Sequence, residues 1–280
     1  MNTLKRIYVI AYIIGAVQLT IIGVQGLVCQ HHMLASLGVM MTALPIVIVL
    51  TMALITQRMA RTSANLPILL VLGFVGVGLA AWDAHMAHGP RDLVYMALAG
   101  WVGALLYVFW YSRFGRTPSP VIAVGEGLAA FEVTNVDDEL DSSATLTQQD
   151  AIIIFIRGNW CPLCMGQVNE MAAGMERFAE KGIRVSFIAP QSLGKTKALA
   201  KGRPDGMHFY SDLKNDAARI LKIHNPAGLP FGMELMGYRS ETVLPTVIAT
   251  SKGGEILWTH ETDNYRVRPT VDELLAVFQE

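Results

Sequence analysis

Two cysteines separated by two residues are the part of this sequence best suited to chemistry. Cys161 and Cys164 lie in the stretch 157–164, RGNWCPLC, directly after the apolar run 151–156. A thiolate is a nucleophile, and a second thiol three residues away can resolve the mixed disulfide that the first one forms. The spacing therefore predicts a redox-active dithiol in which Cys161, expected to be the more exposed, attacks and Cys164 resolves.

The elements around the dithiol explain why a thiolate would form there. The run AIIIFI at 151–156 is apolar and rich in β-branched residues, which is typical of a fully buried parallel strand. Residues 165–181 carry apolar side chains at helical spacing. The cysteines then lie where a strand ends and a helix begins, and unpaired N–H groups and the helix dipole stabilise a thiolate at such a point. Pro162 suits the first helical turn.

A zinc site is the alternative interpretation of a Cys-x-x-Cys pair. It requires two more ligands at metal-like spacing, and the later histidines His208, His224 and His260 are scattered. Three cysteines in 280 residues also argue against a disulfide framework. We therefore favour redox chemistry and predict neither a bound metal nor a cofactor.

The first part of the chain has the composition of a membrane domain. The sequence is 52% hydrophobic and only 16% charged, and Asp83 and Asp92 are the only acidic residues before position 113. A helix needs about 20 apolar residues to cross about 30 Å of hydrocarbon. Four stretches approach that length, and they predict a transmembrane domain of four helices at 1–116 whose partner is the lipid bilayer: 7–28, 33–55, 66–82 and 93–111.

The distribution of basic residues predicts an orientation. A cleaved signal peptide is the rival interpretation of the first stretch, but a second apolar stretch follows almost at once. Only Arg91 lies in the two loops on one side of the predicted spans. The other side holds Lys5, Arg6, Arg58, Arg61, Arg113 and Arg116. By the positive-inside rule, we expect an integral protein of the bacterial inner membrane whose termini and dithiol domain face the cytoplasm.

Metal-binding residue types also occur in the two loops expected outside. Imidazole and thiolate groups there suit copper or zinc. Histidines at the ends of membrane helices are more often polar caps, and we favour that interpretation. The residues concerned are Cys29, His31, His32, Asp83, His85 and His88.

The second part of the chain alternates predicted strands and helices. After a linker at 113–120, we expect an edge strand or hairpin within 121–136 and a surface loop at 137–150. Further strands are predicted at 183–189, 207–210, 243–248 and 255–258, and helices at 191–201, 213–223 and 271–278. This order predicts an α/β sheet covered on both faces, in a thioredoxin-like domain at 117–280.

The stretches of the second half also carry a resemblance to a known family. They are 157–164, 188–192 (IAPQS), 209–212 (FYSD), 244–246 (LPT) and 263–269 (DNYRVRP). In order and spacing this half resembles the peroxiredoxin-like branch of the thioredoxin fold, the alkyl hydroperoxide reductase and thiol-specific antioxidant proteins. The resemblance implies an antioxidant, thiol-dependent oxidoreductase with a reductant such as thioredoxin and a peroxide or protein disulfide as substrate.

Two further residues are expected at the site, the first of them from the resemblance and the second from its place beside the cysteines. Pro245 would be cis and would face the dithiol, where a cis X-Pro bond is uncommon enough to be a deliberate feature. Trp160 would shield the other side of the site.

The sequence departs from this family at two positions. Typical members have Thr-x-x-Cys, and here Cys161 replaces the threonine. In a peroxidase, Cys164 would then be the peroxidatic cysteine by alignment, or Cys161 would be by its expected exposure. Leu244 or Pro245 stands where the family has an arginine, and Arg157 and Arg239 are candidates to replace it.

Three functions therefore stay open at the level of sequence. They are peroxide reduction, thiol–disulfide exchange, and a membrane-tethered redox sensor or assembly factor without turnover. A net charge of −1 and the lack of a basic stripe argue against nucleic acid.

Overall fold

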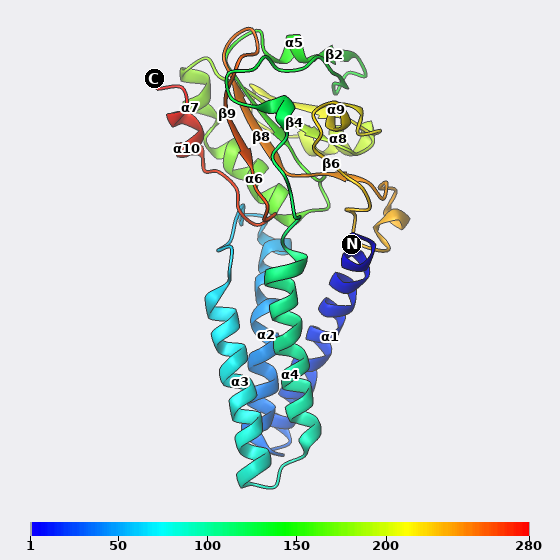
Figure 1. Cartoon of the computed structure of the whole chain (residues 1–280), viewed down its shortest axis with the longest axis vertical. Coiled ribbons are helices and arrows are strands. Elements are labelled where there is room, and N and C mark those ends of the chain that lie inside the picture. Colours follow the sequence, from blue (N-terminus) through cyan, green and yellow to red (C-terminus); the bar gives the residue numbers. More distant parts are fainter. Residues whose placement is uncertain (1, 280) are drawn as a thin grey trace. The chain divides into compact units, whose positions relative to one another are not determined.

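The computed structural model describes residues 2–279 and divides into two compact units. The first comprises Thr3–Thr56 and Thr62–Arg113, and the second comprises Gln57–Arg61 with the chain from Phe114 onward. The short segment 57–61 thus belongs to the C-terminal unit, although in sequence it lies between two helices of the N-terminal unit (Figure 1).

The N-terminal unit consists of four long helices, as the sequence predicted. They are α1 (Asn2–Val28), α2 (Met33–Thr56), α3 (Pro67–Met86) and α4 (Arg91–Leu106), which continues into the π-helical turn η1 (Tyr107–Tyr111). By length and composition, all four are candidates to cross a membrane. The third helix runs past the predicted end at Trp82, because the carboxylate of Asp83 is buried and paired with His32 Nδ1 at 3.1 Å.

Small residues and aromatic rings pack these helices together. A Cβ on Gly38 of α2 would lie 2.3 Å from the carbonyl oxygen of Gly76 of α3, so the two backbones touch where only glycine fits. On α1, the hydroxyl of Tyr8 donates a hydrogen bond to the carbonyl of Gly103 at 2.6 Å. The Tyr12 ring stacks on Tyr107 with centroids 5.8 Å apart.

The C-terminal unit is built on one mixed sheet of seven strands. The central strands β3, β4 and β5 are parallel, and β8, β9 and β1 run antiparallel to their neighbours. The order across the sheet is β2 (Leu140–Ser142), β1 (Glu132–Thr134), β5 (Met207–Ser211), β4 (Arg184–Ala189), β3 (Ala151–Phe155), β8 (Thr246–Thr250) and β9 (Ile256–Glu261). A separate ladder pairs β6 (His224–Asn225) with β7 (Thr242–Val243).

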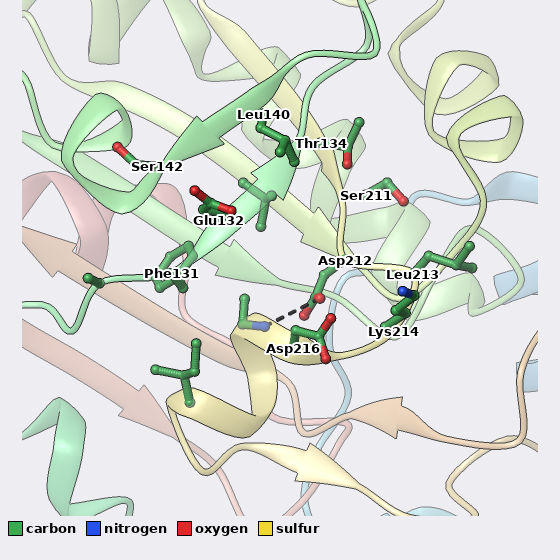
Figure 2. Close-up of a pocket in the computed structure, with 14 residues that line it drawn as sticks. Phe131, Glu132, Thr134, Leu140, Ser142, Ser211, Asp212, Leu213, Lys214 and Asp216 are labelled. Carbon is green, nitrogen blue, oxygen red and sulfur yellow. Dashed lines mark hydrogen bonds between the residues drawn. The ribbon is translucent and has the colours of Figure 1, made fainter.

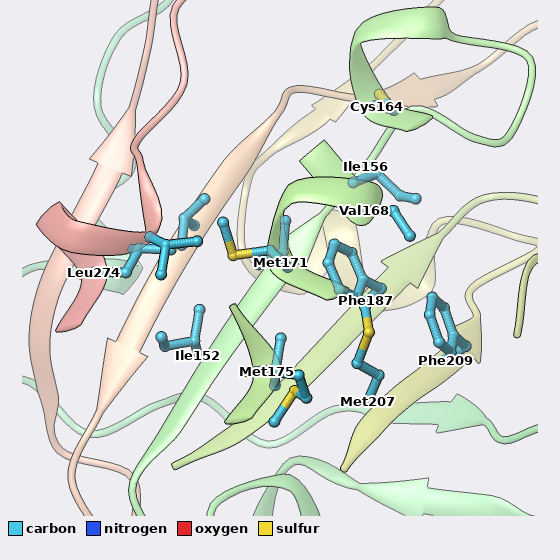
Figure 3. Close-up of a cluster of buried hydrophobic side chains, with 14 of the residues drawn as sticks. Ile152, Ile156, Cys164, Val168, Met171, Met175, Phe187, Met207, Phe209 and Leu274 are labelled. Carbon is cyan, nitrogen blue, oxygen red and sulfur yellow. The ribbon is translucent and has the colours of Figure 1, made fainter. Parts of the chain in front are cut away.

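Helices cover both faces of this sheet, because successive side chains of β3 point to opposite faces and all of them are apolar. Ile152 and Ile154 point into one apolar cluster and Ile153 and Phe155 into another, so the strand is apolar at every position. Side chains of α6 (Pro162–Ala173), α7 (Met175–Glu180), α8 (Leu193–Ala200) and α10 (Val271–Ala276) fill the first cluster (Figure 3). The second contains side chains of η2 (Pro120–Ile122), α5 (Ser143–Leu146) and α9 (Asp216–Ile220).

Three boundaries differ from the sequence prediction for local reasons. The helix expected over 165–181 begins at Pro162 and is interrupted at Gly174, where a Cβ would lie 2.9 Å from the Val271 side chain of α10. The strand expected over 243–248 begins only at Thr246, because Pro245 has no N–H for the ladder. Residues 137–150, predicted as a loop, contain β2 and α5, which lack the apolar alternation of a buried strand.

A buried ion pair holds the start of the C-terminal unit on the sheet. Arg116 Nη2 lies 2.5 Å from Glu261 Oε2 of β9, with 2% of the Arg116 side chain and 9% of the Glu261 side chain exposed. The same guanidinium donates to the Pro245 carbonyl at 3.1 Å and to Thr246 Oγ1 at 3.0 Å. One arginine thus joins the first residues of the unit to the two strands β8 and β9.

We expect Arg116→Ala to destabilise the C-terminal unit by about 3–5 kcal/mol, because it leaves the Glu261 carboxylate buried without its counter-charge. The control is Arg177→Ala, which removes an exposed pair with Asp272 and should cost less than about 1 kcal/mol. Thermal unfolding of the full chain in detergent, followed by tryptophan fluorescence, measures both. Equal losses in the two variants would contradict the assignment.

Candidate functional site

A strand, a tight turn and a helix place the dithiol. The chain leaves β3 at Phe155, and Ile156 N–H still donates to the Ile188 carbonyl at 2.9 Å. Gly158 then has φ +131°, a conformation that side chains other than glycine rarely adopt. Cys161 is the N-cap residue of α6 and Pro162 its first helical residue. The predicted position of the dithiol between strand and helix is therefore confirmed.

Both cysteines are buried free thiols. Cys161 is 2% exposed and Cys164 0%, and both belong to the apolar cluster that contains Ile156 and Val168. Figure 3 shows Cys164 with these two residues. The expectation that Cys161 is the accessible cysteine is thus wrong in this structure. Apolar side chains of other elements pack around both cysteines.

The charge beside the dithiol comes from Arg268. Its Nη2 lies 3.4 Å from Cys164 Sγ, and its Nη1 donates to Gln167 Oε1 at 2.7 Å. Arg268 is 4% exposed and Gln167 is fully buried. Arg268 Nε and Gln167 Nε2 have no hydrogen-bond partner among the described residues, so two donors beside Cys164 are left for an oxygen ligand.

This arrangement separates the two sulfurs electrostatically. Burial raises the pKa of Cys164, but the hydrogen bond from Cys161, the charge of Arg268 and the backbone N–H and charge of Arg157 together lower that pKa to about 5. For Cys161, the hydrogen bond to Cys164 and burial raise the pKa well above its ordinary value. Cys164 is therefore the thiolate of the pair, and Cys161 is the thiol that donates to it.

Aromatic rings and Arg157 enclose the turn before α6. The Arg157 guanidinium lies 4.7 Å from the centre of the Trp160 ring and donates to the Gly228 carbonyl at 2.6 Å. Trp160 Nε1 donates to the Arg157 carbonyl at 3.0 Å, and its ring meets that of Tyr238 edge-on at 6.5 Å. Trp160 therefore stands next to the dithiol, and its shielding role stays a prediction.

Pro245 has a different geometry from the one that the resemblance implied. Every peptide bond within residues 2–279 is trans, so the expected cis Leu244–Pro245 bond is absent there. Backbone and side-chain bonds hold an extended chain at this point: Leu244 N–H donates to the Ile223 carbonyl at 2.8 Å, and Thr246 Oγ1 donates to the Leu244 carbonyl at 2.8 Å. A role for Pro245 at the site stays a prediction.

Arg268 and Gln167 are the site residues that the sequence analysis missed. Of the two arginines expected to replace the family's own, Arg157 lies at the site and Arg239 is exposed on the surface. Arg268 lies in the stretch 263–269, which the resemblance had already marked, but 104 residues separate it from Cys164. Gln167, one turn along α6 from Cys164, carried no signal of its own.

Two other places offer polar groups but no comparable chemistry. Among residues 2–279, no three His, Cys, Asp or Glu side chains gather to hold a metal, and His32 of the N-terminal loops pairs with Asp83. An open cavity of about 670 Å³ lies beside β1 and α9, lined by Phe131, Asp212 and Asp216 among others (Figure 2). The Asp212 carboxylate there accepts the Ala218 N–H at 3.0 Å and so caps α9.

Strands β3, β4 and β5 are parallel, and β8 and β9 form an antiparallel pair at the edge of the same sheet. A Cys-x-x-Cys pair lies at the start of the helix that follows β3. This arrangement is that of a thioredoxin-like domain. Residues 124–258 match the AhpC/TSA family. The C-terminal half of the chain is accordingly a peroxiredoxin-like domain of the thioredoxin superfamily, and that family supports a thiol-dependent redox function.

Solved structures similar to the chain include three bacterial proteins. Peroxidoxin BcpB from Mycobacterium tuberculosis is 16% identical, with a TM-score of 0.47 over 56% of this chain and 96% of that one. Reduced Prx3 from Vibrio vulnificus is 11% identical, with a TM-score of 0.49 over 57% and 99%. AhpC from Enterococcus faecalis is 15% identical, with a TM-score of 0.45 over 55% and 88%. No curated protein matched the sequence.

The two sulfurs should be distinguishable by titration. In a Cys29→Ser background, we expect Cys161→Ser to keep a thiolate that absorbs at 240 nm at pH 7, because the serine hydroxyl can still donate to Cys164 and Arg268 still faces it. Cys164→Ser should lack that absorbance at pH 7, because burial raises the pKa of the remaining Cys161 thiol and the Arg268 contact is with the sulfur of residue 164. A thiolate signal that follows Cys161 instead would contradict this assignment.

Proposed function

We propose that the chain is a membrane-anchored, thiol-dependent peroxidase in which Cys164 attacks a hydroperoxide and Cys161 resolves the oxidised sulfur. The observation that carries the proposal is the contact of 3.4 Å between Arg268 Nη2 and Cys164 Sγ. It supplies the positive charge that a buried thiolate requires.

The first step uses the thiolate of Cys164. The sulfur attacks the distal oxygen of the hydroperoxide, so that an S–O bond forms while the O–O bond breaks. The leaving alkoxide takes the proton of the neighbouring Cys161 thiol and departs as an alcohol, or as water from hydrogen peroxide. Cys164 is oxidised to a sulfenic acid, and Cys161 is left as a thiolate. The open donors on Arg268 and Gln167 are suited to hold the peroxide oxygens.

The second step closes a disulfide within one helical turn. The Cys161 thiolate attacks the Cys164 sulfur, the S–S bond forms, and the hydroxyl leaves as water after taking a proton from solvent. An external dithiol such as thioredoxin then supplies two electrons by thiol–disulfide exchange and restores both thiols. Cys161, at the N-cap of α6, is the sulfur that such a reductant would attack, and this half of the cycle requires it to be uncovered.

Burial favours a peroxide over a protein disulfide as the oxidant. Attack by Cys164 on a protein disulfide would bring its sulfur into direct contact with a sulfur of another macromolecule, and Cys164 is 0% exposed. A hydroperoxide is small enough to reach Cys164 through side-chain motion alone. The buried site thus supports peroxide reduction ahead of disulfide exchange.

We extend the proposal to the other site residues and to location. Trp160 would screen the turn before the dithiol, and Pro245 would border it from the start of β8. The four helices would anchor the domain in the bacterial inner membrane with the dithiol on the cytoplasmic side. Their length and apolar composition support the anchor, and the distribution of basic residues supports the orientation.

The experiment is hydrogen peroxide reduction by the full chain in detergent, with thioredoxin as reductant and Cys29→Ser as the parent. We expect Cys164→Ser to abolish the reaction, because no thiolate attacks the peroxide. Cys161→Ser should complete the first step only, and leave a sulfenic acid on Cys164 that dimedone traps and mass spectrometry locates.

Other outcomes point to the remaining functions. Reduction of insulin disulfides without peroxide turnover would make the chain a thiol–disulfide oxidoreductase. A dithiol that oxidises and reduces reversibly but turns over neither substrate would favour a redox sensor or assembly factor.

The peroxide reaction should also depend on pH in one direction. Because the pKa of Cys164 is lowered to about 5, the thiolate is present above pH 5 and is lost as the pH falls through that value. The rate constant of the Cys29→Ser parent with hydrogen peroxide should be nearly constant from pH 6 to 8 and fall about tenfold per unit well below pH 5. Stopped-flow tryptophan fluorescence measures it, and a midpoint near pH 8.5 would contradict the thiolate.

A further inference from the structure

The segment 57–61 lies against the redox helix α6. Asn169 Nδ2 donates to the Gln57 carbonyl at 2.7 Å, and the Met59 side chain packs against the apolar cluster that contains both cysteines. Ala60 is only 5% exposed. The segment is therefore an integral part of the C-terminal unit.

Gly166 provides the place where the segment passes α6. A Cβ at this position would lie 2.3 Å from the Met59 carbonyl oxygen and 2.7 Å from the Ala60 nitrogen. Main chain therefore touches main chain, two residues after Cys164. Any larger residue at position 166 would push the segment away from the helix.

Arg61 ends the segment and binds the chain that carries Arg268. Its Nε donates to the Arg268 carbonyl at 2.9 Å, and its Nη2 donates to the Pro269 carbonyl at 3.0 Å. The same Nη2 lies 2.5 Å from Glu170 Oε2 on α6. A single guanidinium thus joins the helix of Cys164 to the main chain of the residue that faces it. An arginine can make these three bonds at once because its donors are arranged in a rigid fork.

We infer that residues 57–61 form a positioning strap for the redox site, which fixes the main chain at Arg268 and Pro269 and thereby holds the Arg268 guanidinium against Cys164 Sγ. Arg61 acts through Arg268 and is a positioning residue. The inference rests on the proposed role of Cys164 as the reacting thiolate.

The geometry explains how the hydrogen bond from Arg61 to the Arg268 carbonyl affects the Cys164 sulfur. The Arg268 side chain makes two polar contacts at the site, with Gln167 Oε1 and with Cys164 Sγ. The contact with sulfur is the longer, at 3.4 Å, so a small shift of the Arg268 main chain would lengthen it and weaken the charge interaction. The other groups that act on Cys164 are Cys161 and Arg157, and the Arg157 guanidinium donates to the carbonyl of Gly228, which lies outside the strap.

The test is the titration of Cys164 in the full chain, with Cys29→Ser and Cys161→Ser as the background so that one thiol remains. Thiolate absorbance at 240 nm between pH 3.5 and 8.5 gives the pKa of Cys164 without any turnover. We expect Arg268→Ala to raise the pKa by about one unit or more and Arg61→Ala by about half a unit or more.

Gly166→Ala provides a variant that changes no charge. It displaces the strap by contact with Met59, while alanine favours the helix more than glycine does. We expect it to raise the pKa of Cys164 in the same direction as Arg61→Ala. The matched control is Arg177→Ala, an exposed arginine paired with Asp272, which should leave the pKa unchanged.

The outcomes separate the strap from the thiolate. A charge contact changes a pKa by about one unit. If Arg268→Ala raises the pKa of Cys164 but Arg61→Ala and Gly166→Ala change it by less than about 0.2 units, the strap is overturned and the proposed function stands. If Arg268→Ala itself has no effect, the charge pair behind the proposed function is wrong. Restoration of the background pKa by Arg61→Lys would also overturn the strap, because lysine keeps the charge without the fork.

Discussion

The charge pair between Arg268 and Cys164 is the interaction on which the rest of the site depends. A thiolate without a partner would not persist at a position with no exposed surface, because burial favours the neutral thiol. A hydrogen bond from the Cys161 thiol and the charges of Arg268 and Arg157 together reverse this preference. The family's usual threonine is absent here, and Cys161, at its position, is the donor beside the Cys164 sulfur.

The sheet brings the two halves of this pair together. Strand β3 delivers Cys164 through the turn at Gly158, whereas Arg268 follows β9, which pairs with β8 on the side of β3 away from β4. The register of β3 with β8 and of β8 with β9 therefore fixes where a residue from the end of the chain meets the helix after β3. Arg116, buried against Glu261, ties down the same two strands from the start of the unit.

The sequence predicted the features that depend on neighbouring residues and missed those that depend on distant ones. The run 151–156, the cysteines with Pro162 and the four apolar stretches each carry a local pattern, and the strands, helices and turn that they predict are present. Arg268 meets Cys164 across 104 residues and Arg61 meets the Arg268 carbonyl across 207, and no period or motif encodes such a pairing. The exposure of Cys161 was misjudged for the same reason, since the side chains that cover it come from other elements.

The C-terminal unit is discontinuous in sequence, because residues 57–61 complete it from a point more than fifty residues before its main segment begins. Cutting the chain at the linker near position 114 would thus yield an incomplete domain rather than a separable one. Such a fragment would expose backbone and apolar surface beside Gly166. The carbonyls of Arg268 and Pro269 would lose their hydrogen bonds from Arg61 and would bond to water instead. Fusion of residues 114–280 to another helical unit would carry over the dithiol without Gln57–Arg61, so the two parts of this chain cannot be exchanged independently.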